Sequence, residues 1–500
     1  MKPIVRHVLR VVAILTFFVI APFLVLYAFG YRFTLEERGF QQVGLMVVET
    51  DPRSATVFLK GEEVATRTPY RATSLTPGDY AIRVEREGYH SWEKSLFVES
   101  TLATWVSNIV LFLEQGEQTP LLEGNVTHAA STDTGVIGML VETSTEEDAT
   151  TRAVYFLYPT SKELRQVPMT EAQAETLQRL TSESIALRTT GSVGNPGLLV
   201  TGTDDKNVQQ TFLITEQHVE ILSKDRLVAG GAPFGATIST TDELFLDTRG
   251  RPEFYYTDEG ILNTYDMSSE EIGIVSTQSS VRGFGANSHA YAFLDEEDNI
   301  FVAAPQLLGR FIEEPTYVDQ LDETIASDAS LHIYPGPRGQ EHDVVLLHTT
   351  EALSAFEAET GDIHPIANSV RSFVGAHKLP LIAYETGSEV GFVSFEDVLP
   401  ELSNTQLVDI PAYEPQAPTT LARYSEPIQA LAWHPNDHHV AIRLETRVVI
   451  IELDGRDTRN TAEWDVPALE GVAPFLTFST NGNKLYTSTS DGIIEIQIAE

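Results

Sequence analysis

Cysteine is absent from the 500-residue sequence. Its absence excludes disulfides, thiol nucleophiles, Cys-ligated zinc and an acylated cysteine anchor, so the redox compartment cannot be read from composition. Nucleophile-elbow, H-E-x-x-H, P-loop and G-x-G-x-x-G motifs are also missing. The segment GFGANS at 283–288 lacks the third glycine of the last motif and is predicted to be a turn. The sequence therefore predicts no catalytic residue, no cofactor and no metal site.

Basic residues are scarce, with 33 Lys and Arg against 72 Asp and Glu and a formal net charge of -39. The charge is unevenly distributed: residues 1–42 carry +3, residues 43–114 carry -3, and residues 115–500 alone carry -39. Such a surface repels nucleic acids and anionic lipid, and it favours cations, basic partners or plain solubility at high ionic strength. We therefore expect no nucleic-acid partner.

One long apolar run is present, at residues 11–30, where twenty consecutive positions are uncharged. At the rise of an α-helix, about 20 residues suffice to cross a bilayer. Lys2, Arg6 and Arg10 precede the run in a basic segment, residues 1–10. The positive-inside rule then predicts a cytoplasmic N-terminus, one transmembrane helix, and an extracytoplasmic location for everything after about residue 31.

A cleaved signal peptide is the alternative, because Ala28 and Gly30 supply small residues at a possible cleavage position. The apolar run is longer than the roughly 7–15 residues of a signal-peptide core, which favours an uncleaved anchor. Residues 31–42 are interpreted as a juxtamembrane linker. A reversed, cytoplasmic orientation is disfavoured by the basic N-terminal segment.

Residues 43–114 show the period-two pattern of half-buried antiparallel strands. In DYAIRVE, the alternation places Tyr80, Ile82 and Val84 inward and Arg83 and Glu85 outward. Similar runs are GLMVVETDP, SATVFLKG, KSLFVES and TWVSNIVLFL, separated by Pro and Gly turn signals. These runs predict a small β-sandwich of five or six short strands.

At its turns this segment resembles the PEGA domain, a small β-sandwich module of surface proteins. The matching positions are Pro52, Ala55, Gly61, Thr68-Pro69, Pro77-Gly78 and Gly88-Tyr89. The resemblance implies a structural spacer or a surface interaction module, and it transfers no set of functional residues. Tyr89 and Trp92 are interpreted as core or hairpin packing, with ligand stacking as the alternative.

Internal repetition is clearest near the C-terminus, where residues 430–453 align without a gap with residues 475–498 at an offset of 45. Each unit reads as strand, tight turn, strand, polar turn, strand. This spacing is typical of a β-propeller blade. The two units resemble blades of the WD40-like and TolB-like propeller class.

Weaker candidate units precede these two, and together they make eight. They lie at 135–159, 198–214, 243–266, 290–304, 344–366 and 380–395. Residues 115–500 are therefore predicted to form a β-propeller of seven or eight blades. A pair of stacked β-sandwich domains is the alternative, although it requires a linker near the middle of the segment.

Two irregular segments fall within the predicted propeller. Residues 170–184 have helical composition and spacing and are predicted to be a helical excursion from the disk. The proline-rich stretch 410–427 lies too late to divide two sandwich domains and is interpreted as a long inter-blade loop.

Several side chains are possible metal ligands, although their patterns are weak. His434, His438 and His439 lie close together, but the aligned repeat has Asn483 and Lys484 there and a single loop cannot close a site. The acidic turns at 202–207 and 294–299 offer oxygen ligands for calcium without the spacing of an EF-hand. Glycoside hydrolysis needs a pair of carboxylates. Residues 115–500 contain sixty acidic residues, and the sequence singles out no particular pair among them.

These features together predict a mainly β, single-pass, membrane-anchored surface protein without enzymatic activity. In this hypothesis the PEGA-like module is a spacer, and the propeller binds an envelope protein or polysaccharide. The alternative is a surface enzyme, a hydrolase or lyase acting on glycans or peptides, with its site in the propeller channel.

Overall fold

The computed structural model describes most of the chain, and most of the residues that it leaves out lie between 222 and 362 and at 396–416. The described ranges are 3–28, 31–34, 39–131, 135–144, 150–159, 161–190, 197–215, 219–221, 253–258, 261–266, 271–274, 281–286, 291–295, 297–303, 316–321, 329–334, 344–350, 352–357, 363–395, 417–470 and 472–500.

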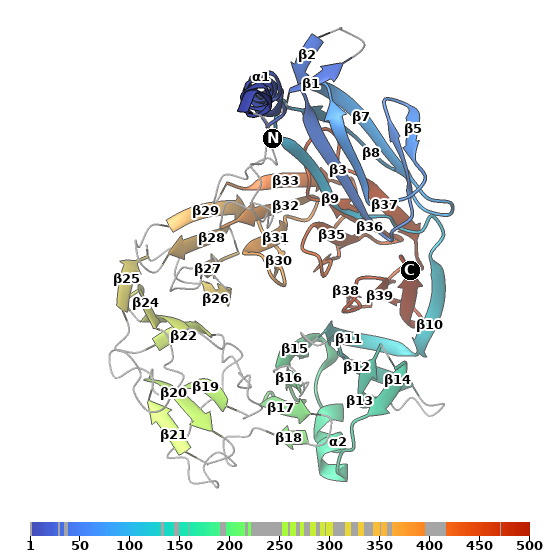
Figure 1. Ribbon diagram of the computed structural model, residues 1–500. Coiled ribbons are helices and arrows are strands. Elements are labelled where there is room, and N and C mark those ends of the chain that lie inside the picture. Colours follow the sequence, from blue (N-terminus) through green and yellow to red (C-terminus); the bar gives the residue numbers. More distant parts are fainter. Residues whose placement is uncertain are drawn as a thin grey trace.

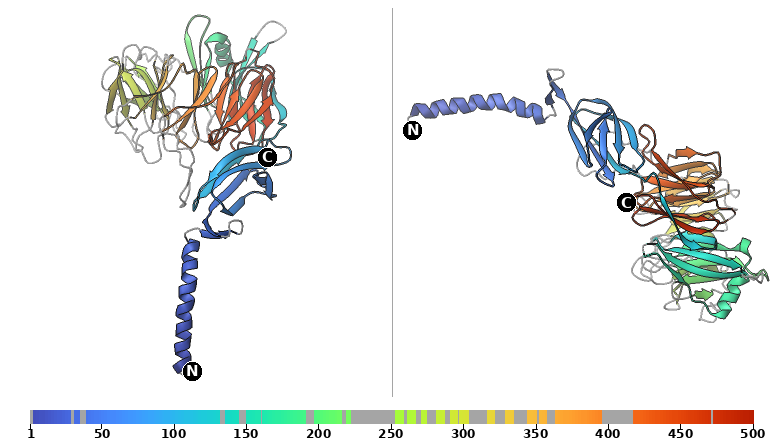
Figure 2. Two further views of the ribbon diagram at one scale, coloured as in Figure 1. Left: turned by 90° about the horizontal axis from the view of Figure 1, so that it is seen from above. Right: turned by 90° about the vertical axis from the view of Figure 1, so that its right-hand side faces the viewer.

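The N-terminal apolar run forms helix α1 (Pro3–Ala28), which projects away from the rest of the molecule (Figure 2). Val12, Phe17 and Leu24 on this helix are 53%, 65% and 62% exposed. Over the residues whose side chains the structure describes, no helix reaches the length and apolarity needed to cross a membrane. The span predicted for residues 11–30 is therefore not confirmed by the structure.

The segment predicted as a juxtamembrane linker, residues 31–42, contains a two-stranded hairpin. Its strands are β1 (Tyr31–Thr34) and β2 (Gly39–Gln42), which pair antiparallel. The hairpin lies between helix α1 and the small domain (Figure 2).

The small domain is a sandwich of two sheets. One sheet has the order β6-β3-β9 and the other the order β5-β4-β7-β8. The strands are β3 (Gly44–Asp51), β4 (Thr56–Leu59), β5 (Glu62–Ala65), β6 (Tyr70–Leu75), β7 (Gly78–Glu85), β8 (Trp92–Val98) and β9 (Ala103–Val110). There are thus seven strands rather than the predicted five or six, because β5 and β6 lie largely exposed and lack an alternating apolar pattern.

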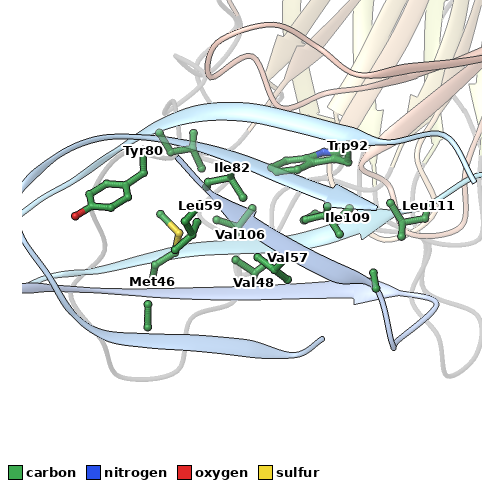
Figure 3. Close-up of a cluster of buried hydrophobic side chains, with 14 of the residues drawn as sticks. Met46, Val48, Val57, Leu59, Tyr80, Ile82, Trp92, Val106, Ile109 and Leu111 are labelled. Carbon is green, nitrogen blue, oxygen red and sulfur yellow. The ribbon is translucent and has the colours of Figure 1, made fainter. Parts of the chain in front are cut away.

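The core between these two sheets follows the sequence alternation (Figure 3). Tyr80, Ile82 and Val84 are buried, as predicted. The prediction of purely antiparallel pairing is wrong, because β3 and β9 run parallel. The two strands lie at opposite ends of the domain sequence, so a local pattern cannot reveal how they pair.

Eight further sheets lie in the described residues between 117 and 497, and they follow one another around a ring (Figure 1). The first four comprise β11 (Asn125–Ser131), β12 (Ile137–Ser144), β13 (Thr150–Tyr158) and β14 (Glu163–Gln166); β15 (Ala186–Thr190), β16 (Gly197–Thr203), β17 (Gln209–Thr215) and β18 (Val219–Ile221); β19 (Glu253–Asp258), β20 (Ile261–Asp266) and β21 (Glu271–Ile274); and β22 (Val281–Ala286), β23 (Tyr291–Asp295), β24 (Asn299–Ala303) and β25 (Thr316–Gln320).

The next three sheets each have four antiparallel strands. They comprise β26 (Ser330–Tyr334), β27 (Val344–His348), β28 (Ala352–Glu357) and β29 (Ile363–Asn368); β30 (Ser372–Gly375), β31 (Leu381–Glu385), β32 (Glu389–Ser394) and β33 (Thr419–Arg423); and β34 (Ala430–Trp433), β35 (His439–Arg443), β36 (Arg447–Glu452) and β37 (Thr461–Asp465).

The last sheet joins the two ends of the large domain. It contains β38 (Leu476–Phe478), β39 (Lys484–Thr489) and β40 (Gly492–Gln497), and its fourth, outer strand is β10 (Glu117–Glu123) from the start of the domain. Innermost strands of successive sheets contact one another, as β30 with β34 and β34 with β38. This ring of antiparallel sheets, closed by strands from both ends, is a β-propeller rather than a pair of stacked sandwiches.

Each of the eight units traced in the sequence falls in a different sheet of this ring. Part of the third unit, residues 243–252, lies outside the described residues. The predicted helical excursion is confirmed as α2 (Glu171–Gln178), which begins after a capping box formed by Thr170 and Gln173 and is followed by a short 3-10 turn at Ser182–Ser184.

Two predictions about irregular segments are wrong. Residues 283–286 belong to strand β22 instead of a turn, because Gly283 and Gly285 pair with Leu294 and Ala292. The proline-rich stretch at 410–427 contains strand β33, which pairs with β32, although its residues 410–416 lie outside the described part of the chain.

Candidate functional site

The small domain packs on the last two sheets of the propeller through a buried charge. Lys94 lies at an inward position of strand β8, and its side chain is 0% exposed. Its ammonium nitrogen is 2.6 Å from Glu452 Oε1 on the propeller. It also donates to the backbone carbonyls of Asp454, Arg456 and Thr458 at 2.7, 2.9 and 3.0 Å. A buried charge compensated on several sides is compatible with burial, whereas an unpaired one is strongly destabilising.

Glu452 connects this ammonium group to neighbouring groups on both domains. Its Oε2 accepts a hydrogen bond from the indole N–H of Trp92 at 2.8 Å. Its Oε1 accepts from the backbone and side-chain amides of Asn460, both at 2.9 Å. Since both oxygens have donors, the carboxylate is held in one orientation. These hydrogen bonds join the two domains, so they hold the small domain in one orientation relative to the propeller.

An apolar contact continues the interface beside the Lys94 network. Phe112, at the end of the small domain, meets the rings of His439 at 5.5 Å and Trp464 at 6.0 Å edge-on. The indole N–H of Trp464 donates to the carbonyl of Leu113 at 3.1 Å. The N–H of Leu113 in turn donates to the carbonyl of Ile498 at 2.8 Å. The connection between the domains is therefore packed and hydrogen-bonded.

Two of the three clustered histidines, His434 and His439, serve this packing. Burial lowers the pKa of His434 to about 4 and lowers the pKa of His439 well below its ordinary value, so both imidazoles are neutral at pH 7. Their rings pack edge-on against Phe112. His438 is only partly buried and faces a cleft described below. No group of three or more metal-ligating side chains was found in the described part of the chain.

The acidic turns considered for calcium use their carboxylates locally. Asp204 accepts from the backbone N–H groups of Lys206 at 3.0 Å and Val208 at 2.8 Å. Asp295 accepts from the N–H groups two and four residues further on, both at 2.9 Å. These are hairpin turns in which the side chain replaces a backbone acceptor.

A third carboxylate holds two neighbouring sheets together. Asp437, in the turn between β34 and β35, is buried and accepts from three successive backbone N–H groups of the preceding sheet. The donors are His377 at 2.9 Å, Lys378 at 2.6 Å and Leu379 at 3.0 Å. This side chain therefore fixes the loop at the inner edge of the adjacent sheet.

A cleft of about 710 Å³, measured to include its open mouth, lies between the two domains. We call it the interdomain cleft. Its lining residues are Trp92, Trp105, Ser107, Asn108 and Ile109 of the small domain and Leu381, Asp437, His438, His439, Glu452, Leu453, Asp454 and Arg456 of the propeller.

Asp454 and Arg456 form a charged pair at the cleft. The guanidinium of Arg456 donates to both carboxylate oxygens, the shortest contact being 2.7 Å from Nη2 to Oδ2. Burial opposes ionisation of Asp454, but the hydrogen bonds and charge of Arg456, together with the charge of Lys94, outweigh it and lower its pKa. The pair is therefore ionised at pH 7 and its charges largely cancel.

The sequence predicts no site residue, and neither the interdomain cleft nor the Lys94 network follows from its motifs. One signal was available: in WEKSLFV the alternation puts Lys94 on the same side as Trp92 and Leu96. A lysine at an inward strand position indicates a buried charge and hence a partner. Trp92 packs in the small-domain core, as predicted, but its indole N–H also reaches the propeller.

Comparison with known proteins identifies the small domain: residues 43–111 match the PEGA domain. No curated protein sequence matches the chain.

Solved structures that resemble the chain include β-propellers. BamB from Moraxella catarrhalis is 11% identical, with a TM-score of 0.38, covering 77% of this chain and 99% of its own. The Cps50 (Swd1) β-propeller domain from Myceliophteria thermophila is 13% identical, with a TM-score of 0.37 and coverages of 63% and 97%. A chain from the mitotic checkpoint complex is 11% identical, with a TM-score of 0.36 and coverages of 78% and 93%.

Proposed function

We propose that this chain is a membrane-anchored, extracytoplasmic binding protein in which the PEGA domain links the anchor to a β-propeller and holds the propeller in one orientation relative to itself. Membrane attachment is supported by the uncharged run of residues 11–30, the basic residues before it, and the exposed apolar side chains along helix α1. The small domain lies between this helix and the propeller (Figure 2).

The Lys94–Glu452 contact carries the proposal. A flexible spacer would need no buried ion pair, whereas here a lysine with 0% exposed side chain enters a ring of propeller oxygens. The PEGA domain then acts as a bracket that fixes the orientation of the propeller relative to the PEGA domain. Fixed presentation favours binding because less orientational freedom is lost when a partner docks.

We further propose that the propeller has eight blades. Eight separate sheets in the described residues, one of them completed by β10, support this number. The proposed role is non-enzymatic binding of an envelope polysaccharide or envelope protein. A surface hydrolase or lyase with its site in the propeller channel is the alternative outcome of the test.

Two measurements test this function. The first compares reporters that are active only outside or only inside the cytoplasm, each fused after residue 500. We expect activity from the outside reporter, and activity from the inside reporter alone would contradict the proposed orientation.

The second measurement incubates the purified full chain with envelope polysaccharide freed of protein, and separately with envelope protein freed of polysaccharide, at low and high salt. We expect co-sedimentation with one fraction and no change in the size of the polymer. Depolymerisation of the polysaccharide or cleavage of the protein would replace the binding function with an enzymatic one.

A further inference from the structure

His439, the first residue of strand β35, lies at the boundary between the PEGA domain and the propeller. Its side chain is buried, and its ring packs edge-on against Phe112 with the ring centroids 5.5 Å apart. The same residue lines the interdomain cleft and a second, smaller cavity that both domains border. The PEGA domain therefore supplies part of the cover that shields this imidazole from water.

Among the described residues, the ionisable groups that act on His439 are all basic. Burial, followed by the charges of His434, His438 and Lys94, holds the pKa of His439 well below its ordinary value. Its Nδ1 atom lies 3.2 Å from the side-chain amide of Asn436, which carries no charge. A proton added to this ring would thus be repelled by the ammonium group of Lys94 and would have no anion of its own.

The carboxylates that line this boundary are already bound. Glu452 borders the same two cavities, but its oxygens accept from Lys94 and Trp92. Asp437 accepts from three backbone N–H groups, and Asp454 is paired with a guanidinium. An imidazolium at position 439 could recruit Glu452 only by breaking the bonds that join the two domains.

His434 depends less on the position of the PEGA domain. Its Nε2 atom lies 3.3 Å from the carbonyl oxygen of Gly482, and its ring packs against Phe478, both within the propeller. The other charged groups that act on it are Asp51, which favours its protonation, and His377, which opposes it. Most of its surroundings would remain if the domains separated, so His439 is the residue that links proton uptake to docking.

We propose that the contact between the PEGA domain and the propeller is a proton-sensitive joint, which is closed at neutral pH and opens in acid when His439 takes up a proton. The docked state shields the neutral imidazole. A separated chain exposes it to water, where neither burial nor Lys94 opposes the proton. In the extracytoplasmic location proposed above, the joint would follow the pH of the surroundings. It does not depend on which ligand the propeller binds.

The direction of the effect follows from the linkage between proton binding and docking. A group whose pKa is lower in the docked state contributes docking stability that is complete above its ordinary value of 6.5 and is lost as the pH falls. One proton taken up on separation raises the ratio of separated to docked chains about tenfold for each pH unit. Between pH 6.5 and about pH 5 the ratio should therefore rise about 30-fold.

Amide hydrogen exchange of the full chain in dodecyl maltoside measures this ratio, because the headgroup of this detergent does not titrate. The reporting amides are those of Glu93 and Ser95, which donate across the interface to Asn460 Oδ1 at 3.1 Å and Asp457 Oδ2 at 2.8 Å. Exchange is followed by mass spectrometry from about pH 8 to about pH 5 and is corrected for the pH dependence of free amides. The amides of strand β12 report on the propeller itself.

We expect the protection of Glu93 and Ser95 to be constant above pH 6.5 and to fall about 30-fold by about pH 5. Strand β12 should stay protected throughout, because the propeller remains folded. His439→Gln keeps a polar side chain that cannot take up a proton in this range, and it should abolish the fall.

His438→Gln is the matched control. It is the same substitution at the neighbouring position, but the charges of Asp437 and Asp454 favour a proton on His438 and partly offset its burial. This variant should therefore retain most of the fall in protection.

Three results would overturn the proposal. They are constant protection of Glu93 and Ser95 over the whole range in the wild type, an equal fall in the wild type and His439→Gln, and a parallel loss at β12, which would mean that the propeller unfolds as a whole. If His439→Gln does not dock at about pH 8, His439→Phe takes its place, since its ring can pack against Phe112 and cannot be protonated. The reporter and co-sedimentation measurements at neutral pH are unaffected, so a wrong joint is distinguishable from a wrong function.

Discussion

Lys94 Nζ of the PEGA domain lies 2.6 Å from Glu452 Oε1 of the propeller, and both side chains are almost completely buried. Removing one partner of a buried, hydrogen-bonded pair leaves the other charge without compensation. The structure therefore predicts that the domain interface depends strongly on this one lysine.

The first prediction concerns Lys94→Ala. We expect a loss of about 3–5 kcal/mol of interface stability, the usual cost of an uncompensated buried charge. Limited proteolysis and amide hydrogen exchange of residues 454–460 measure the loss. Arg83→Ala removes an exposed ion pair of the same domain and should cost under about 1 kcal/mol. Equal protection of residues 454–460 in both variants would contradict a buried ion pair.

The second prediction concerns pH. The folded protein keeps His434 neutral with a pKa of about 4, whereas an unfolded chain takes up a proton near the ordinary value of 6.5. Stability should therefore be fully present above pH 6.5 and fall by about 3 kcal/mol as pH drops from 6.5 to 4, with no further loss from this group below pH 4. His439 acts in the same direction.

Urea unfolding followed by tryptophan fluorescence, repeated at several pH values, measures this dependence. In His434→Gln the slope of stability against pH between 4 and 6.5 should decrease. An unchanged slope would show that His434 is not the group that titrates.

The third prediction concerns Asp437, which accepts from three backbone N–H groups of the preceding sheet. Asp437→Ala leaves these donors unpaired and should destabilise the propeller by about 2–4 kcal/mol. The amides of Lys378 and Leu379 should then exchange faster with solvent. Asp204→Ala is the control, because among the described residues the Asp204 carboxylate bonds within its own hairpin, and it should leave these two amides unaffected.

The fourth prediction concerns the closure of the ring. Ile496 on β40 is fully buried, and β40 pairs with β10 from the start of the domain. Ile496→Ala should cost about 2–5 kcal/mol, the range for truncating a buried isoleucine. Val208→Ala, at a side chain that is 50% exposed, should stay within about 0.5 kcal/mol of wild type. Thermal unfolding of the two variants measures the difference. If Ile496→Ala is no less stable than Val208→Ala, the sheet formed by β10 and β40 is not tightly packed.

The sequence predicts those parts of the fold that are repeated or alternating. The alternation of Tyr80, Ile82 and Val84 marks the small-domain core, and the repeat of 430–453 in 475–498 marks the propeller. Strand β5 was missed because its exposed residues carry no apolar pattern. The parallel pairing of β3 with β9 was missed because it depends on contacts across the whole domain.

The interdomain cleft was beyond sequence reasoning for a related reason. Trp105 and His438 come from different domains, and nothing in either local pattern states that they face the same space. Only the position of Lys94 hinted at an interface. Sites built between domains depend on how the domains dock, and periodicity within one element carries no information about docking.

The most direct test of the docked arrangement exploits the absence of cysteine. The backbone N–H of Ser95 donates to Asp457 Oδ2 at 2.8 Å across the interface, so the double substitution Ser95→Cys and Asp457→Cys introduces the only two thiols of the chain. Mild oxidation followed by peptide mass spectrometry should find these two residues joined in most molecules of the full chain. A control pair, Ser95→Cys with Asp205→Cys, should remain reduced. If the first pair forms no more disulfide than the control, the PEGA domain does not dock on the propeller in this way and the interdomain cleft does not exist.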